Sequence, residues 1–255
     1  MNDIPTTPTF RLDGKRALVT GAGRGLGQAF AAALAQAGAH VTLLARSRDE
    51  IEAVAAALRK SGLKADALAL DVTDLDTMRT AIAAAEPFNI LINNAGTNRP
   101  GPFLDTKVED FDYVLNINVR AAYFVAQAVA RRLVEAKQPG SIINVSSQMG
   151  VVGSPRRTLY CASKHAMEGM TKALAWELGT AGIRVNTLCP TFIETAMTSG
   201  MFAEPAFRTW VCDRIALGRL GRVEEIMGAV VFLASDASSL MTGSALMLDG
   251  GWSAA

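Results

Sequence analysis

The sequence predicts one α/β domain built on a doubly wound, seven-stranded parallel sheet with helices on both faces. Short, almost wholly apolar runs alternate along the 255 residues with longer alanine-rich segments, as expected for buried parallel strands and crossover helices. Half of the residues are hydrophobic and 19% are charged, which is enough apolar material for a large core. No linker, solenoid repeat or composition shift marks a domain boundary, so residues 1–255 are expected to form a single unit.

Seven apolar runs are expected to form the strands of this sheet. Each has three to five consecutive residues with few polar interruptions, the pattern of a strand covered on both faces. They lie at 17–20, 41–44, 67–70, 90–92, 142–145, 184–188 and 245–248.

Helices are expected between these runs. The first ends at Gly38, and the second begins at Ser47, which forms a capping box with Glu50 three residues later. The helices other than the second are predicted at 26–37, 74–85, 108–136, 158–179 and 223–234. Residues 1–10 are expected to be a loose arm, since they lack the basic start and apolar stretch of a signal peptide. The uncharged segment 25–45 is interrupted by polar residues, so a helix followed by a buried strand explains it better than a membrane span.

Charge and cysteine content favour a small-molecule partner. The 25 Lys and Arg residues nearly balance the 24 Asp and Glu residues, and this gives no electrostatic case for binding nucleic acid or an anionic membrane. The cysteines at 161, 189 and 212 fit no metal-binding spacing, and their odd number leaves an unpaired thiol in any disulfide scheme. Reduced thiols in a cytoplasmic protein, with no bound metal, are the expectation.

A glycine-rich loop lies between the first predicted strand and the first helix, over Thr20–Gly27. Glycines at this place let the backbone turn tightly and approach a pyrophosphate at the helix N-terminus, as in a Rossmann-type dinucleotide site. The glycines at 21, 25 and 27 do not follow the usual G-x-G-x-x-G spacing, and a tight turn without a ligand is the alternative. The loop also lacks the Gly-Lys-Ser/Thr ending of a nucleoside-triphosphate loop, which disfavours kinases and ATPases.

The residues after the second strand bear on which dinucleotide binds. An NAD site usually places a carboxylate there, whereas this chain has Ala45 followed by Arg46, and Arg24 lies in the glycine loop. Two guanidinium groups suit a 2′-phosphate, so NADP(H) is favoured and NAD(H) stays possible. The alternative for Arg46 is a solvated surface charge, while Asp49 and Glu50 are explained by the helix start.

Tyr160 and Lys164 are spaced to share one face of a predicted helix. A lysine ammonium near a tyrosine can lower the pKa of the phenol and make it an acid/base near neutral pH, although such pairs are often structural. Ser147 follows the strand at 142–145, where a doubly wound fold places its ligands. Asn118 falls inside a long helix, where asparagine is unfavourable and invites a reason.

Together these motifs resemble the short-chain dehydrogenase/reductase family, in its short single-domain branch. The resemblance covers Arg11 to Trp252, and the separation of 13 positions between Ser147 and Tyr160 selects Ser147 over Ser146. The residues that carry it are Thr20–Gly27, Asp71-Val72, Asn93–Gly96, Asn118, Ser147 and Tyr160-x-x-x-Lys164.

The resemblance implies a hydride transfer between a nicotinamide and a secondary alcohol or ketone. In it Tyr160 is the acid/base, Lys164 lowers the pKa of Tyr160 and holds the ribose, Ser147 orients the carbonyl, and Asn118 supports a water relay to Lys164. The implied cofactor contacts are Gly21, Gly23, Arg24, Gly25, Leu26, Gly27, Arg46, Asp71, Val72, Asn93, Ala95, Gly96, Tyr160, Lys164, Pro190, Ile193 and Thr195. The chain has Pro190-Thr191 where the family commonly has Pro-Gly, so the backbone contacts at Thr191 are the weakest part of the resemblance.

The lid residues and the polar residues after the strands bear on the substrate. Residues 191–216 correspond to a substrate lid, whose Met and aromatic side chains either wall an apolar pocket or serve helix packing; they include Ala196-Met197-Thr198-Ser199, Met201, Phe202, Phe207 and Trp210. One of the arginines in this region is a candidate for binding a carboxylate or phosphate on the substrate, and solvated loop charges are the alternative. The polar residues after the relevant strands are Asn98, Arg99, Gln148, Arg156 and Arg157. The chain is similar to gluconate 5-dehydrogenase-like sugar-acid reductases and to 3-oxoacyl-carrier-protein reductases, and a small cyclic ketone is a third possibility.

The family resemblance also implies a homotetramer joined through the two long helices and the C-terminal strand region. Small residues on those helices would permit close contact, although they also suit packing within one chain: Ala121, Ala128, Ala162, Ala166, Gly169 and Ala173.

Three other functions are weighed against a dehydrogenase. A dinucleotide-binding regulatory protein without turnover is disfavoured by the complete set of Ser147, Tyr160, Lys164 and Asn118. A nucleotide-sugar epimerase needs a larger C-terminal domain than the 65 residues after Pro190 provide. A plain interaction module leaves the glycine loop unexplained.

Overall fold

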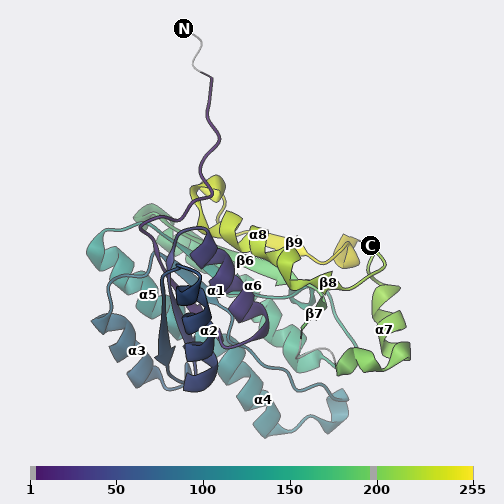
Figure 1. Cartoon of the computed structure of the whole chain (residues 1–255). Coiled ribbons are helices and arrows are strands. Elements are labelled where there is room, and N and C mark those ends of the chain that lie inside the picture. Colours follow the sequence, from purple (N-terminus) through teal and green to yellow (C-terminus); the bar gives the residue numbers. More distant parts are fainter. Residues whose placement is uncertain (1–3, 196–199, 255) are drawn as a thin grey trace.

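A seven-stranded parallel sheet forms the centre of the computed structural model, which describes residues 4–195 and 200–254 (Figure 1). The strand order is β3-β2-β1-β4-β5-β6-β9, and every neighbouring pair is parallel. The strands are β1 (Arg16–Thr20), β2 (His40–Ala45), β3 (Ala65–Ala69), β4 (Ile90–Asn93), β5 (Gly140–Val145), β6 (Ile183–Pro190) and β9 (Ala245–Leu248). All seven predicted strands are confirmed, and β6 continues two residues past its predicted end.

Helices cover both faces of the sheet, so the predicted doubly wound fold is confirmed. In β1, Ala17 and Val19 belong to the core under α1, α2 and α8, whereas Leu18 points into the opposite core beneath α3, α5 and α6. This alternation is the consequence of a strand that is buried on both sides. The helices are α1 (Gly25–Gln36), α2 (Arg48–Lys60), α3 (Leu75–Ala84), α4 (Val108–Leu115), α5 (Ala122–Ala136), α6 (Thr158–Leu178), α7 (Pro205–Cys212) and α8 (Val223–Ala234).

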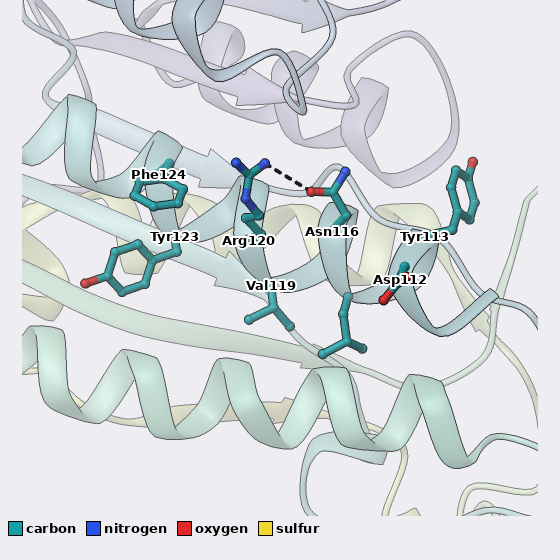
Figure 2. Close-up of a pocket in the computed structure, with 8 residues that line it drawn as sticks. Asp112, Tyr113, Asn116, Val119, Arg120, Tyr123 and Phe124 are labelled. Atoms are coloured by element: carbon teal, nitrogen blue, oxygen red, sulfur yellow. Dashed lines mark hydrogen bonds between the residues drawn. The ribbon is translucent and has the colours of Figure 1, made fainter. Parts of the chain in front are cut away.

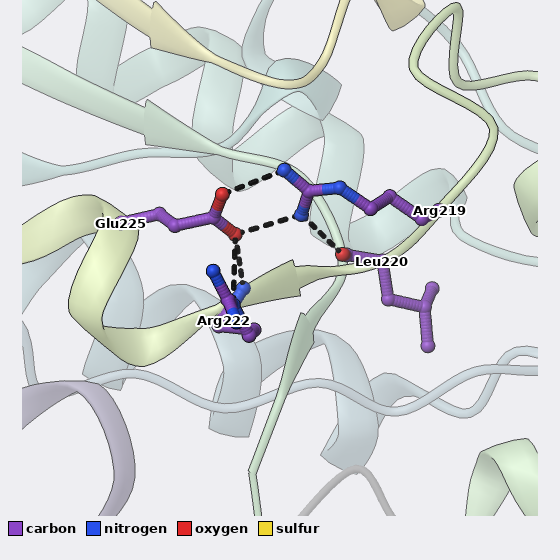
Figure 3. A network of polar contacts seen from close by, with 4 residues as sticks. All are labelled: Arg219, Leu220, Arg222 and Glu225. Carbon is purple, nitrogen blue, oxygen red and sulfur yellow. Dashed lines mark hydrogen bonds and ion pairs between the residues drawn. The ribbon is translucent and has the colours of Figure 1, made fainter.

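The predicted helix ends have the expected chemistry. The Ser47 hydroxyl accepts a hydrogen bond from the Glu50 backbone N–H at 3.4 Å and caps α2, as predicted. At the start of α8, Glu225 accepts the Arg222 backbone N–H at 2.8 Å and receives two hydrogen bonds from Arg219 (Figure 3). The Arg219 hydrogen bond lowers the pKa of Glu225 to about 2. This network fixes the short connection into α8.

The long helix predicted over 108–136 is continuous but not uniform. A π-helical turn over Asn116–Ala121 joins α4 to α5. A π-helical turn inserts one extra residue into the hydrogen-bonded ladder and is often found at functional sites. The turn falls on Asn118, the residue whose mid-helix position was unexplained by the sequence.

The segment after β6 contains structure that the sequence did not predict. The two-residue strands β7 (Ile193–Glu194) and β8 (Gly221–Arg222) pair in parallel. Between them in the chain, α7 lies within the predicted lid. Aromatic rings from this region pack on one another, with Phe207 stacked on Trp210 at 6.0 Å between centroids and Trp210 against Trp252 at 5.9 Å. In the described part of the lid, these rings therefore serve local packing. Ala196–Ser199 of the predicted lid lie outside the described residues.

The N-terminal segment lies apart from the sheet and its helices (Figure 1). Residues 4–9 run away from the body of the molecule, as expected for an arm, whereas the ring of Phe10 packs against Phe232 of α8 at 6.3 Å between centroids; residues 1–3 lie outside the described residues (Figure 1). Among the described helices, none is long and apolar enough to cross a bilayer.

Candidate active site

The glycine loop is held against the carboxyl end of β4. The Thr20 hydroxyl accepts hydrogen bonds from the backbone N–H groups of Asn94 and Ala95, both at 3.0 Å. The Asn94 side-chain amide donates to the carbonyl oxygens of Thr20 at 2.9 Å and Gly21 at 3.1 Å. Thr20 and Asn94 thus fix the loop; both belong to the motifs that carry the family resemblance, but neither is among the cofactor contacts that it implies. The sequence feature that could have indicated these contacts is a threonine hydroxyl at the end of one strand and an asparagine amide just after a neighbouring strand.

Two glycines are required by the shape of this loop. Gly21 has a φ of 65°, a backbone conformation that side chains disfavour. A Cβ atom on Gly27 would lie against the Gly21 carbonyl oxygen and 2.6 Å from the Asn94 amide nitrogen. The first turn of α1 follows directly, and its N-cap residue, Arg24, provides no side-chain cap. Uncapped N–H groups at a helix start favour an anion, so this cradle fits the pyrophosphate of a dinucleotide.

Charged side chains of both signs lie on and beside the glycine loop. Arg24 lies in the loop, and Arg46 directly follows β2; both are exposed, and the Ala22 N–H donates to the Leu44 carbonyl at 3.2 Å. Glu50 was attributed to the helix start alone, but its carboxylate also lies beside the loop, because a Cβ on Gly23 would be 2.8 Å from Glu50 Oε2. The two arginines favour a phosphate, whereas Glu50 favours ribose hydroxyls.

Three of the predicted reacting residues lie after the carboxyl end of β5, where Ser147 is found, and on α6, which carries Tyr160 and Lys164. The Ser147 hydroxyl accepts the Met149 N–H at 3.1 Å and donates to Gln148 Oε1 at 2.7 Å. Lys164 Nζ donates to the Val145 carbonyl at 2.7 Å and lies 5.5 Å from the centre of the Tyr160 ring. Since Val145 ends β5 two residues before Ser147, the structure brings these three predicted residues together.

Burial is the largest influence on the pKa values of both Tyr160 and Lys164. Burial raises the pKa of Tyr160 to about 12, and a hydrogen bond with Ser147 acts in the opposite direction. Burial lowers the pKa of Lys164 to about 8, opposed by Cys189 and Glu168. That Lys164 lowers the pKa of Tyr160 stays a prediction, since burial is the largest influence on the phenol in this arrangement of side chains. The ammonium bonds to a backbone carbonyl, and the cost of burying the phenolate dominates.

Asn118 connects the π-helical turn to the site. Its side-chain oxygen accepts the Thr97 N–H at 2.8 Å, and its amide donates to the Thr97 carbonyl at 2.9 Å and to the Ser163 hydroxyl at 3.0 Å. Ser163 in turn donates to the Tyr160 carbonyl at 2.8 Å, so Asn118 braces the first turn of α6. A Cβ on Gly96 would be 3.4 Å from Asn118 Oδ1 and 4.0 Å from Lys164 Nζ, which places the three residues close together. The water relay itself stays a prediction.

The other predicted cofactor residues on the first half of the sheet take different positions. Asp71 follows β3, and its carboxylate accepts the N–H and hydroxyl of Thr73 at 2.9 and 2.7 Å; Val72 beside it is buried. Asn93 is buried, and its amide donates to the Ala122 carbonyl and to Asn144, both at 3.0 Å. Asn93 therefore ties β4 to α5 and β5 through its side chain.

The turn after β6 contains a buried hydroxyl group, that of Thr191. Pro190 and Ile193 are buried and Thr195 is half-buried. The Thr191 N–H donates to the Leu248 carbonyl at 3.1 Å, whereas Thr191 Oγ1 is buried without a hydrogen-bond partner among the described residues. In that part of the chain, positive φ outside glycine occurs only at Lys137 and Arg156, so Thr191 does not need the conformation of the glycine it replaces. A buried, unpartnered hydroxyl at this turn fits a polar group of a bound cofactor.

The three arginines expected near a substrate have different surroundings. Arg99 pairs with Asp110 at 3.5 Å and lies over the Tyr113 ring at 4.8 Å, so its charge is already engaged. Arg156 is exposed. Arg157 is half-buried one helical turn before Tyr160, and burial lowers its pKa.

Comparison with known proteins agrees with this geometry. The family model described as enoyl-(acyl carrier protein) reductase matches residues 21–253. The chain is 41% identical to gluconate 5-dehydrogenase of Gluconobacter oxydans (strain 621H), over 95% of this chain and 96% of that protein. It is 39% identical to the 3-oxoacyl-[acyl-carrier-protein] reductase of Thermotoga maritima, over 95% and 99%.

A solved structure gives the same result. The crystal structure of a gluconate 5-dehydrogenase from Burkholderia cenocepacia J2315, in complex with NADP and tartrate, matches with a TM-score of 0.93 and 37% identity, over 96% of this chain and 98% of that one. The chain therefore belongs to the short-chain dehydrogenase/reductase family of oxidoreductases, which transfer hydride between a nicotinamide and a secondary alcohol or ketone carbon.

Proposed function

We propose that this chain is an NADP(H)-dependent dehydrogenase/reductase for a small polyhydroxy acid of the gluconate type. The observation that carries the proposal is the convergence of Ser147, Tyr160 and Lys164 beside the glycine loop. Support for the substrate class comes from the relatives, because one is named a gluconate 5-dehydrogenase and another was solved with tartrate, a hydroxy diacid. A 3-oxoacyl thioester and a small ketone are the competing substrates. None of the relatives named above is a regulatory protein, so that alternative gains no support.

The residues of the chain would divide the work of the reaction. Bound NADP(H) supplies or accepts the hydride. In reduction, Tyr160 donates its proton to the forming alkoxide, and its raised pKa keeps that proton in place through the neutral range. Ser147, held by Met149 and Gln148, orients the carbonyl oxygen beside Tyr160. Asn118 keeps the first turn of α6 in position through Ser163.

The preference for NADP(H) over NAD(H) rests on Arg24 and Arg46, since two guanidinium groups can grip a 2′-phosphate. The NADP in the Burkholderia structure supports the same choice. Glu50 beside Gly23 acts against it, because a carboxylate repels a phosphate. NAD(H) is therefore proposed as a poorer, usable cofactor.

A panel of substrates tests the function. We expect gluconate oxidation with NADP⁺, followed at the nicotinamide absorbance, to exceed in kcat/KM both the reduction of a 3-oxoacyl thioester and the oxidation of a neutral polyol. NADP⁺ should give a higher kcat/KM than NAD⁺. Turnover of the thioester alone would replace the substrate class, and no turnover of any alcohol or ketone with either cofactor would contradict the function.

Arg157 is expected to bind the substrate carboxylate. It forms no ion pair with an acidic residue in the described part of the chain, and it lies one turn from Tyr160. Replacing Arg157 by Met should raise KM for gluconate about tenfold, because a hydrogen bond to a charged group contributes about 1.5–3 kcal/mol. KM for a neutral polyol should stay the same.

Arg156→Met is the matched control, since Arg156 has the same charge in the same loop but is exposed. Equal losses on gluconate in both variants, or equal losses on charged and neutral substrates in Arg157→Met, would refute a carboxylate contact at Arg157.

Assembly as a homotetramer in the cytoplasm is also proposed. An open groove on the long helix is lined by Tyr113, Val119, Tyr123, Phe124 and Arg120, which donates to Asn116 at 3.2 Å (Figure 2). This groove contains none of the reacting residues, and a helix of a second copy would cover it. Its neighbour α6 exposes small residues at Ala162, Ala166, Gly169 and Ala173, whereas Ala121 is buried within its own chain. Sedimentation would measure the assembled mass.

The proposed location in the cytoplasm is supported by the free thiols, because unpaired cysteines are typical of a reducing compartment.

A further inference from the structure

A buried carboxylate lies directly behind the reacting residues of α6. Tyr160, Lys164 and Glu168 follow one another at intervals of four residues and therefore share one face of the helix. Lys164 is 5% exposed and Glu168 is 7% exposed. Burying a charged carboxylate is costly unless it is hydrogen-bonded and paired, so its position needs an explanation.

Two residues of β6 hydrogen-bond the carboxylate of Glu168. The Thr187 hydroxyl donates to Glu168 Oε2 at 2.9 Å, and the Cys189 thiol donates to Glu168 Oε1 at 3.4 Å. Gly150 closes the other side, because a Cβ there would be 3.1 Å from Glu168 Cγ and 3.2 Å from Oε1. Both carboxylate oxygens are thereby fixed in place.

The groups that face Lys164 are few. Tyr160 and Glu168 lie on its own helix, and Cys189 lies on β6. Burial, with Glu168 adding to it, raises the pKa of the Cys189 thiol to about 12, so the thiol stays neutral and contributes no charge near neutral pH. Glu168 is then the anionic group that acts on Lys164 among the described residues. Its charge opposes the burial that lowers the pKa of Lys164 to about 8.

We propose that Glu168 is a positioning residue that acts through Lys164, its fixed charge keeping the ammonium protonated at the pH at which the enzyme works. The proposal rests on the function proposed above, together with the role that the family resemblance implies for Lys164, an ammonium that lowers the pKa of Tyr160 and holds the nicotinamide ribose. Glu168 sets the upper pH limit of carbonyl reduction and does not touch substrate or cofactor itself.

Glu168→Gln tests this idea, since it keeps the shape and an acceptor for Thr187 and removes the charge. An opposite charge favours the protonated form of an amine, so its removal lowers the pKa of Lys164. Activity that requires the ammonium is lost as pH rises through that pKa. We therefore expect the alkaline midpoint of kcat/KM for reduction to move down by about one pH unit, with little change at pH values well below it.

A second measurement separates this proposal from the proposed function. NMR of ¹³C-labelled lysine, with the Lys164 signal assigned from a Lys164→Met variant, follows the titration without turnover. The Lys164 midpoint should fall in Glu168→Gln and stay unchanged in Glu177→Gln, which removes an exposed charge from the same helix. An unchanged Lys164 midpoint in Glu168→Gln would overturn the proposal even if the enzyme is active.

Glu168→Asp covers the case in which the glutamine variant does not fold. It keeps the charge on a side chain shorter by one methylene group, so the Lys164 midpoint should fall by less than the charge removal predicts. A fall of about one pH unit in Glu168→Asp, as large as that expected for removal of the charge, would contradict the proposal, because the charge is still present in this variant.

Discussion

Replacing Tyr160 by Phe should lower kcat by roughly 10²–10⁴-fold, the usual contribution of a positioned acid/base. The substitution removes the phenolic hydroxyl and keeps the ring in place. The hydrogen bond from Ser163 to the backbone carbonyl of residue 160 does not depend on that hydroxyl, so the brace from Asn118 should persist. The dissociation constant for NADPH should therefore stay close to its original value in a fluorescence titration.

Tyr123→Phe is the matched control for this variant. Tyr123 lies on α5, in the groove proposed to contact a second copy and away from the reacting residues, so losing its hydroxyl should leave kcat and cofactor binding unchanged, provided that sedimentation gives the same assembled mass. A Tyr160→Phe enzyme with near-normal kcat would show that another group moves the proton. A parallel loss of NADPH binding would instead indicate that the ring, and not its hydroxyl, was the important part.

The sheet could be predicted from the sequence because its strands are buried on both faces. The run 90–92 contains no polar residue and the run 142–145 contains only Asn144, which distinguishes them from amphipathic helices and from half-exposed strands. Ser47 marked the start of α2 because a cap depends on local chemistry alone. The elements β7, β8 and α7 were missed, since two-residue strands have no periodicity and the aromatic residues near α7 pack against distant segments such as Trp252.

The candidate site was predicted as a set of residues, but not as a set of interactions. Spacing by four placed Tyr160 and Lys164 on one face of α6, yet it could not show that the ammonium turns to the Val145 carbonyl. The direction of the Tyr160 pKa shift depends on that side-chain orientation and on burial, neither of which the spacing contains. Asn118 was noticed as an anomaly, and its reason, a π-helical turn bound to Thr97, required the backbone.

Replacing Gly27 by Ala should weaken both cofactor binding and the fold. The new Cβ would lie against the Gly21 carbonyl oxygen, 2.8 Å from the Gly21 carbonyl carbon and 2.6 Å from the Asn94 amide nitrogen. Backbone cannot yield as a flexible side chain can, so the loop must separate from α1. Overpacking of this kind costs about 1–3 kcal/mol, which urea unfolding would measure as a lower free energy of unfolding. Because the displaced loop is the proposed pyrophosphate cradle, NADPH affinity should fall at least about tenfold, the equivalent of 1.4 kcal/mol.

Gly228→Ala provides the control for the substitution itself. Gly228 is exposed on α8, and a Cβ there meets no atom within 4 Å. Alanine should stabilise that helix by up to about 1 kcal/mol, since glycine loses more conformational entropy on folding, and NADPH affinity should not change. If Gly27→Ala behaved like Gly228→Ala in both measurements, the loop would have room for a side chain, and the close contact of Gly27 with Gly21 would not be what shapes the cofactor site.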